Sequence, residues 1–282
     1  MPMTQQDILD HYQKQWRQQS ESATDVGGLA YSNAVQDAVL YPAYQRLIAD
    51  LGIRADGGSV LDVGSGSGRW VRFFLERYRP RLLAGIDFSA SSIELLQRWH
   101  HSEATSLEFR VADITAPDLD LAATYDLVNV ANVLFHIPEP ELFRRAMENL
   151  ARLVAPDGFI VATEFLPRCT MRTEWMLVRS RYEFEAAAEA AGLRVAAVRS
   201  FSFFSGEPMG IDGPDQGSRR LFHQARAHMG GLLASKLDAP LRRLLVEFMS
   251  EIERAAVAFC RERLSDIELP AQKLVVLRRA AR

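Results

Sequence analysis

The chain has 282 residues, of which 48% are hydrophobic and 24% are charged. This composition is typical of a folded globular protein with one large core or two modest ones, and it excludes a disordered chain. The formal net charge of −3 excludes the overall basic field that steers proteins to nucleic acid or to anionic membranes. We therefore expect a small, weakly charged partner molecule.

Targeting and redox signals favour a cytoplasmic protein. The first residues lack the basic-then-apolar order of a signal peptide, and no apolar run approaches the roughly 20 residues of a membrane-spanning helix. The two cysteines, Cys169 and Cys260, form no C-x-x-C pattern and have no second metal ligand spaced beside them. We expect neither a disulfide framework nor a bound metal.

The N-terminal residues predict two helices. Ile8, Tyr12 and Trp16 recur every four residues and form a narrow apolar stripe on a Gln-rich helix over residues 4–19. A second helix is expected over residues 31–51 and ends before a glycine. The narrow stripe indicates that the first helix docks on a later part of the chain.

The stretch that follows organises the rest of the chain. Residues 59–63 are an apolar strand that breaks into the alternating glycines Gly64, Gly66 and Gly68, and a helix begins at Arg69. Glycines let the backbone approach a ligand, and the helix behind them presents unpaired N–H groups and the positive end of its dipole. The G-x-G-x-x-G pattern of nicotinamide and flavin sites fails, because Arg69 stands where its last glycine is required.

Two predicted strands end in acids at the same edge. Asp62 is a carboxylate in a strand that is otherwise apolar, so it needs a partner such as a ligand cation or the N–H groups of the glycine loop. Residues 82–86 form a second apolar strand that ends in Asp87, which follows Gly68 by 87 − 68 = 19 residues. At this distance an acid is placed to bind a ribose diol.

The remaining elements alternate between strand and helix, as in a parallel sheet covered on both faces. Strands are predicted at residues 59–63, 82–86, 107–111, 125–131, 159–165, 193–203 and 273–277. Two helices are predicted to begin at residues 69 and 91, and a third begins at residue 140 and is ended by residues 156–158. Further helices are predicted at residues 182–191, 218–234 and 241–264. This order divides the chain into an N-terminal helical cap (1–55), a core (56–205), a helical insertion (206–270) and the last strand of the core (271–282).

Four segments carry a family resemblance. They are Leu61–Gly68, Gly85–Ser89, Val111–Ile114 and Tyr125–Ile137, and each follows or ends a predicted strand. In order and spacing they resemble the successive motifs of class I S-adenosylmethionine-dependent methyltransferases, over roughly residues 59–165. The resemblance implies S-adenosyl-L-methionine as the cofactor and an α/β, Rossmann-like seven-stranded methyltransferase fold, a mostly parallel sheet with one antiparallel strand.

The resemblance also implies which residues bind the cofactor. The glycines would surround its methionine part, Asp87 would bind the ribose hydroxyls, Asp113 and Ile114 would surround the adenine, and the backbone near Val130 would meet the amino group. The full predicted set is Asp62, Gly64, Ser65, Gly66, Gly68, Asp87, Phe88, Asp113, Ile114 and Val130. N-terminal helices often cover the cofactor in this family, which makes Tyr12, Trp16 and Tyr31 candidates for the acceptor pocket, although these helices could instead only cap the sheet.

The loops after the fourth, fifth and sixth strands are expected to face the acceptor. His136 is the candidate catalytic base, since an ordinary histidine pKa of about 6.5 suits proton transfer at cytoplasmic pH; a structural histidine is the alternative. The other candidates in these loops are Glu164, Arg168, Arg172, Phe203 and Phe204. The arginines at 168, 172, 179 and 181 are expected to form a solvated basic face.

The insertion has two alternative roles. It leaves the core after the sixth strand and returns at the antiparallel seventh, so it begins and ends on the acceptor side. It would then roof the site together with the N-terminal helices. The alternative is that the long helix at 241–264 forms the interface of a homodimer.

These features predict a metal-free S-adenosylmethionine-dependent methyltransferase of a small molecule, such as a secondary metabolite or a sugar. Orientation of the reactants supplies about 7–11 kcal/mol and a positioned base about 3–5 kcal/mol, so the acceptor atom does not follow from any one side chain. Oxygen is preferred, since no amino-methylation signature follows the fourth strand. The alternatives are a cofactor-binding protein that no longer methylates, and an RNA or protein methyltransferase.

Overall fold

The computed structural model describes residues 4–22, 34–121, 123–172, 176–202, 224, 239–263 and 272–280. The helices are α1 (Gln5–Ser22), α2 (Ala34–Leu51), α3 (Arg69–Arg77), α4 (Ala90–Trp99), the 3-10 helix η2 (Leu134–His136), α5 (Pro140–Leu153), α6 (Arg181–Ala190) and α8 (Ala239–Arg261). The strands are β1 (Ser59–Val63), β2 (Leu82–Asp87), β3 (Ser106–Val111), β4 (Tyr125–Ala131), β5 (Val154–Glu164), β6 (Met171–Arg172), β7 (Leu177–Val178), β8 (Leu193–Ser200) and β9 (Lys273–Arg279).

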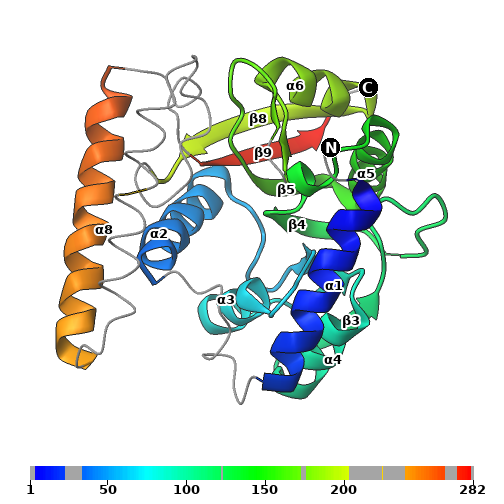
Figure 1. Ribbon diagram of the computed structural model, residues 1–282, viewed down its shortest axis with the longest axis horizontal. Helices are drawn as coiled ribbons and strands as arrows, with labels where there is room; N and C mark the ends of the chain where they lie inside the picture. Colours follow the sequence, from blue (N-terminus) through cyan, green and yellow to red (C-terminus); the bar gives the residue numbers. More distant parts are fainter. Residues whose placement is uncertain are drawn as a thin grey trace.

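Seven of these strands form one sheet in the order β3-β2-β1-β4-β5-β9-β8 (Figure 1). The pairs from β3 to β5 are parallel, whereas β9 runs antiparallel to both β5 and β8. The order reverses between β1 and β4, and this is the point at which open α/β sheets bind ligands. The predicted fold class, a Rossmann-like seven-stranded methyltransferase fold, is confirmed.

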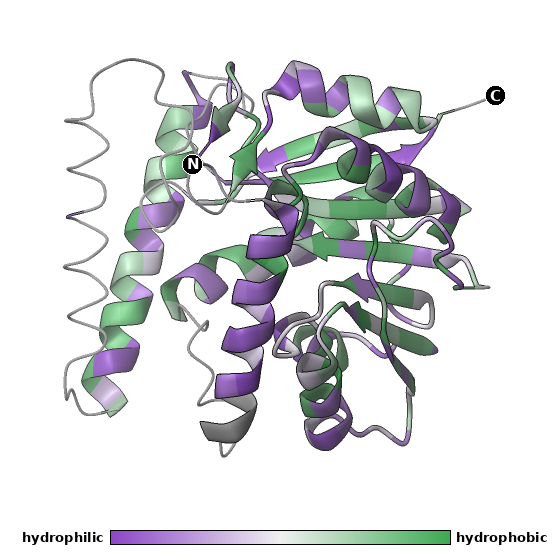
Figure 2. Cartoon of the chain, turned by 45° about the vertical axis from the view of Figure 1, so that its right-hand side comes forward, coloured by the Kyte–Doolittle hydropathy of each residue, from purple (hydrophilic) through white to green (hydrophobic). Residues whose placement is uncertain are grey.

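Helices cover both faces of the sheet because its central strands are apolar on both sides. All five residues of β1 are buried. One core cluster joins the sheet to α5 and α6 through residues such as Phe143 and Phe184, and the other joins it to α2, α3 and α4 through residues such as Leu47, Phe73 and Leu96. Figure 2 shows hydrophobic strands inside and helices with hydrophilic outer faces.

The structure differs from the predicted elements at three places. Residues 156–158, which were predicted to end the preceding helix, form a bulge inside β5. The strand pairs Val154 with Tyr125 before this bulge and Phe159 with Leu127 after it. The sixth strand, expected to reach 203, ends at Ser200. The small hairpin of β6 and β7 was not predicted, since two-residue strands leave no periodicity to detect.

Helices α1 and α8 lie at different places around the sheet (Figure 1). Helix α1 lies across the edge where the parallel strands end and packs beside α4, whereas α8 runs along α2, where Arg254 Nη1 donates to the carbonyl of Ala38 at 3.4 Å. The helix predicted at 218–234 lies outside the described residues. Several apolar side chains of α8 are exposed: Leu241, Leu244, Phe248, Ile252 and Phe259. Within the described ranges, no helix has the length and apolar character needed to cross a bilayer.

Candidate active site

A cavity lies under α1, at the carboxyl ends of β1, β2 and β4. The cavity is open to solvent on one side, and its empty space, with that solvent included, is about 720 Å³. Its lining residues are Gln5, Ile8, Leu9, Tyr12, Trp16, Val63, Gly64, Ile86, Asp87, Phe88, Ala112, Asp113, Ile114, Thr115, Asn132, Val133, His136 and Ile137. Most of this lining is apolar, with a few acids and one imidazole.

The glycine loop reaches the cavity through Gly64 and continues beneath α1. The N–H groups of Gly64 and Ser65 both donate to the carbonyl of Ile86, at 2.8 and 3.0 Å, which ties the loop to β2. Gly66 has a φ of +51°, and a Cβ built on it would lie 2.7 Å from the indole ring of Trp16. Helix α1 therefore packs directly on the loop, and only glycine fits beneath it.

Asp87 lines the cavity and is hydrogen-bonded to the glycine loop. Its Oδ2 accepts the N–H of Gly66 and its Oδ1 accepts the N–H of Ser89, each at 2.9 Å. Burial raises the pKa of Asp87, while these backbone donors lower it. Because a carboxylate accepts about four hydrogen bonds, Asp87 keeps capacity for the hydroxyl groups of a ligand.

Asp62 lies behind the loop in a buried chain of hydrogen bonds. Tyr44 of α2 donates to Asn129 Oδ1 at 2.8 Å, and Asn129 Nδ2 donates to Asp62 Oδ1 at 2.7 Å. The second oxygen of Asp62, Oδ2, is buried without a hydrogen-bond partner, and burial raises the pKa of this carboxyl to about 7. This unpaired oxygen suits the binding of a cationic group near the glycine loop, because pairing with a cation would offset the cost of burying the Asp62 carboxylate.

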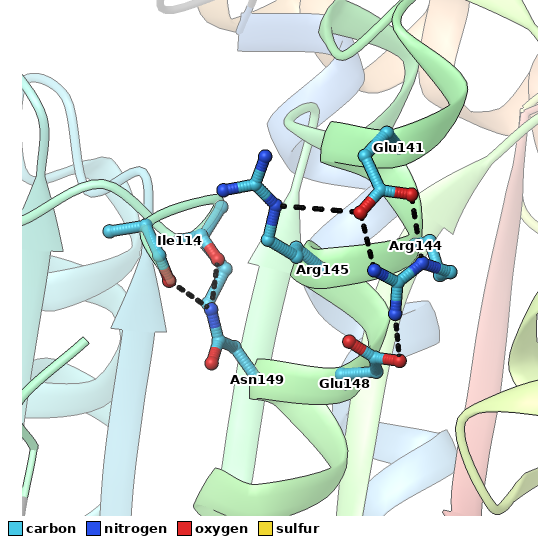
Figure 3. A network of polar contacts seen from close by, with 7 residues as sticks. Ile114, Glu141, Arg144, Arg145, Glu148 and Asn149 are labelled. Carbon is cyan, nitrogen blue, oxygen red and sulfur yellow. Dashed lines mark hydrogen bonds and ion pairs between the residues drawn. The ribbon is translucent and has the colours of Figure 1, made fainter. Parts of the chain in front are cut away.

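The loop after β3 supplies another part of the lining, through Ala112, Asp113, Ile114 and Thr115. Asp113 Oδ1 accepts hydrogen bonds from the N–H and the hydroxyl of Thr115, at 2.8 and 2.9 Å. Asn149 of α5 fixes the next turn, because its Nδ2 donates to the carbonyls of Ile114 and Ala116 at 2.7 and 2.9 Å (Figure 3). The loop is therefore held in shape by groups other than a ligand.

Figure 3 also shows a second set of polar contacts on the same helix. Arg144 pairs with both Glu141 and Glu148, and Arg145 lies 4.0 Å from Glu141. These side chains are largely exposed, and exposed ion pairs of this kind contribute only about 0–1 kcal/mol. The buried amide of Asn149, rather than this network, links α5 to the site.

His136 projects from η2 at the end of β4. The backbone N–H group of His136 donates to the carbonyl of Val133 at 2.9 Å, and this hydrogen bond fixes the tight turn. The hydroxyl of Tyr12 lies 3.0 Å from Nε2 and 3.5 Å from Nδ1 of the imidazole. The two rings meet edge to face with centroids 5.0 Å apart. A helix near the N-terminus thus contacts the candidate base directly.

The buried side chain of Arg179 supports the loop that follows η2. Arg179 Nη2 donates to the carbonyls of Ile137 and Pro138 at 2.8 and 3.3 Å, and its guanidinium lies 3.6 Å from the centre of the Phe143 ring. Burial lowers the pKa of Arg179 to about 10 and raises that of the neighbouring Glu164 to about 8. The expectation of a solvated basic face is therefore wrong for Arg179, because these carbonyls and the aromatic ring take it out of water.

The cavity brings together part of the predicted site. Six predicted residues line it: Gly64, Asp87, Phe88, Asp113, Ile114 and His136. Five others do not line it, namely Asp62, Ser65, Gly66, Gly68 and Val130; the side chain of Val130 is fully buried in the core. Tyr12 and Trp16 line the cavity, whereas Tyr31 lies outside the described residues.

The predicted acceptor loops are only partly present at the cavity. The loop after β4 contributes Asn132, Val133, His136 and Ile137, but Glu164, Arg168 and Arg172 after β5 do not line it. Phe203 and Phe204 lie outside the described residues. Sequence reasoning missed Thr115 and Asn149, because a Thr two residues after an acid and a polar residue in a helix carry no distinctive signal. Among the described residues, no group of three or more His, Cys, Asp or Glu side chains is placed to hold a metal.

The comparisons with known proteins agree with this geometry. A family model described as "Methyltransferase domain" matches residues 60–158, which run from β1 into β5 and include most of the cavity wall. This part of the chain is a class I S-adenosylmethionine-dependent methyltransferase domain. Its cofactor is S-adenosylmethionine.

Curated relatives of this methyltransferase are distant. Ubiquinone biosynthesis O-methyltransferase of Bordetella avium is 26% identical over 57% of this chain and 73% of its own length. Erythromycin 3''-O-methyltransferase of Saccharopolyspora erythraea is 27% identical over 40% of this chain and 36% of its own length. The chain thus spans most of the first relative but only about a third of the second.

A solved structure shows the same fold across the chain. The 1,6-didemethyltoxoflavin-N1-methyltransferase of Burkholderia thailandensis, with S-adenosylhomocysteine bound, aligns with a TM-score of 0.53 and 16% identity. The alignment covers 100% of this chain and 92% of that chain. The likeness therefore includes regions outside the methyltransferase domain, at the level of the fold.

Proposed function

We propose that this methyltransferase transfers the methyl group of S-adenosylmethionine to a hydroxyl group of a small molecule. The observation that carries the proposal is a single cavity that unites two acids, at the end of β2 and after β3, with the imidazole of His136. The acids suit the hydroxyls and the base of an adenosyl group. The imidazole suits an acceptor that loses a proton.

The residues divide into those that hold the cofactor and those that face the acceptor. Asp87 binds the ribose, Asp113 and Ile114 flank the adenine, and the glycine loop approaches the methionine part. When bound, S-adenosylmethionine supplies a methyl group already activated by the sulfonium. The main task of the chain is then to hold the acceptor oxygen in line with that methyl, because orientation contributes about 7–11 kcal/mol.

His136 accepts the proton that the hydroxyl loses. Bound S-adenosylmethionine would supply the methyl group, so the products would be the methyl ether, S-adenosylhomocysteine and the protonated imidazole of His136. A positioned base typically contributes about 10²–10⁴-fold to such a step. The names of both O-methyltransferases described above support oxygen as the acceptor atom.

The charge of the lining favours an acceptor without acidic groups. The described residues around the cavity include Asp87 and Asp113 but no lysine or arginine. A phosphate or carboxylate would meet like charges there and no described counter-charge. Neutral phenols and alcohols, including sugar and polyketide hydroxyls, fit better.

The proposal is tested by measuring S-adenosylhomocysteine formation with a panel of acceptors. The panel contains neutral phenols, sugar alcohols, amines and carboxylates, with product mass measured for each. We expect turnover with neutral hydroxyl acceptors, and we expect it to persist in the presence of a metal chelator. Turnover restricted to amines would replace oxygen by nitrogen. Tight cofactor binding without turnover on any acceptor would favour a protein that no longer methylates.

A further inference from the structure

We infer that Asn132 binds the acceptor, because its side-chain amide is placed to donate a hydrogen bond to an uncharged oxygen beside the methylated hydroxyl. Acceptors with a neighbouring ether, carbonyl or hydroxyl oxygen are therefore preferred. The inference rests on the proposed function, since it takes the site to methylate a neutral hydroxyl compound. Asn132 follows β4 and lines the cavity.

The backbone of Asn132 has a left-handed conformation, with a φ of +59°. Among the described residues, Leu166 is the other non-glycine residue with a positive φ. Residues held in this region carry strain and cluster at ligand-binding sites, and asparagine adopts it more readily than most side chains. Glycine would satisfy the turn without strain, but it would bring no side chain to the cavity.

Three hydrogen bonds hold Asn132 in place. Its backbone N–H donates to Thr163 Oγ1 at 2.8 Å, and the Thr163 hydroxyl donates in return to Asn132 Oδ1 at 2.9 Å. Gln272 Nε2 donates to the same Oδ1 atom at 2.7 Å, and Gln272 Oε1 accepts from Gln36 Nε2 of α2 at 3.0 Å. The protein alone thus orients the Asn132 amide, and both lone pairs of its oxygen are used.

The nitrogen of the same amide, Nδ2, remains as a donor. Within the described part of the chain, this nitrogen neither makes a hydrogen bond nor belongs to the buried polar atoms that lack one. A side-chain amide carries two N–H donors. A ligand that covers Nδ2 without accepting from it would leave a desolvated donor unpaired, which disfavours that ligand. The site therefore selects for a hydrogen-bond acceptor at this place.

The partners of Asn132 place its amide on the acceptor half of the site. Thr163 belongs to β5 and Gln272 immediately precedes β9, and both strands lie on the side of β4 that is away from β1. The glycine loop, which approaches the methionine part of the cofactor in the proposed function, follows β1. The amide is therefore placed for the acceptor rather than for the cofactor.

Neighbouring groups limit the chemistry of the acceptor. Asp87 and Asp113 line the cavity without a described lysine or arginine, so an anionic oxygen is disfavoured. Asn132 and His136 are four positions apart in one loop, and both line the cavity. The oxygen that binds the amide is therefore close to the hydroxyl that gives its proton to His136. A phenol or an alcohol with an adjacent neutral oxygen has this arrangement.

The first test measures binding and needs no turnover. Nitrogen-15 spectra of the full chain saturated with S-adenosylhomocysteine are recorded with 2-methoxyphenol, 2-hydroxyacetophenone or phenol, and Asn132→Asp identifies the Asn132 amide signals by their loss. We expect the first two compounds to shift these signals and to bind about tenfold or more tighter than phenol. In Asn132→Asp, which keeps the shape but removes the donors, this difference should disappear. Amide signals that respond to none of the three compounds, or equal affinity for all three, would overturn the inference.

The second test uses turnover and a second variant. Asn132→Gly suits the positive φ and adds no charge, so it controls for the backbone strain and for the carboxylate of Asn132→Asp. In both variants we expect the preference in kcat/KM for 2-methoxyphenol over phenol to fall about tenfold, with cofactor affinity nearly unchanged. Gln97→Glu, at an exposed position of α4, makes the equivalent change elsewhere and should keep the wild-type preference. A preference that survives in Asn132→Asp would make the role of Asn132 purely structural.

The outcomes separate the inference from the proposed function. If the wild-type chain methylates no acceptor, the proposed function fails, and the binding spectra alone decide whether Asn132 contacts the phenols. If hydroxyl acceptors with and without the neighbouring oxygen are methylated with equal kcat/KM, the proposed function stands and the inference about Asn132 fails.

Discussion

The Oδ2 atom of Asp87 accepts a hydrogen bond from the backbone N–H of Gly66 at 2.9 Å. This contact links the acid at the end of β2 to the glycine loop at the end of β1. One side chain thus shapes the loop and offers a carboxylate to the cavity, and its removal affects both.

Asp87→Ala should weaken S-adenosylmethionine binding by about tenfold to a hundredfold. The variant removes a hydrogen bond to a charged group, worth about 1.5–3 kcal/mol, and frees the N–H of Gly66. Calorimetric titration with the cofactor measures the change, and Asp118→Ala, at an exposed position, is the control. An unchanged dissociation constant in a folded Asp87→Ala protein would remove Asp87 from the cofactor site.

Asn149→Ala should weaken cofactor binding without touching the cavity. It leaves the carbonyls of Ile114 and Ala116 without the amide that fixes them, and an unpaired buried group costs about 1–3 kcal/mol. We expect several-fold weaker binding and a lower Tm. Glu148→Ala, one residue earlier and exposed, should change neither. Binding as tight as wild type would show that the loop after β3 keeps its shape without Asn149.

The fold was predictable because its signals are local. Apolar runs ended by acids gave β1 and β2, and the glycine spacing gave the turn into α3. The cavity wall formed by Asp87 and Asp113 followed from the rule that parallel strands end at one edge. These features need only short stretches of sequence and one topological rule.

The rest of the site depends on contacts that no local pattern records. The stripe of α1 predicted that the helix docks, but not that Tyr12 meets His136, 124 residues away. Arg179 was predicted to be solvated from its charge, yet backbone carbonyls and Phe143 hold it in the interior. Such placements are set by tertiary packing, which a single sequence does not display.

His136→Ala should leave cofactor affinity nearly unchanged and lower kcat by more than tenfold. The imidazole lines the cavity from the loop after β4, whereas Asp113 lines it from the loop after β3, and the proposed interaction of His136 is made with the acceptor in the transition state. Steady-state kinetics and cofactor titration measure the two quantities, with the exposed His101→Ala as control. A smaller drop in kcat would make His136 a packing residue rather than a base.

Glu164→Gln should make the stability of the protein less sensitive to pH. Burial raises the pKa of Glu164 to about 8 in the fold, above its ordinary value of 4.5, while Arg179 acts in the opposite direction. The folded state therefore binds more protons than the unfolded state between these values. The stability contribution of the protonated acid is fully present below the ordinary value and is lost as pH rises through about 8.

Glutamine keeps the shape of the neutral acid and cannot ionise. The free energy of unfolding of Glu164→Gln, relative to wild type, should thus increase by about 1–4 kcal/mol between about pH 5 and about pH 9. Urea unfolding at several pH values measures this difference, and Glu148→Gln on the exposed face of α5 supplies the control. A difference that stays constant across this range would mean that Glu164 is already ionised in the fold at pH 5, held in that state by Arg179.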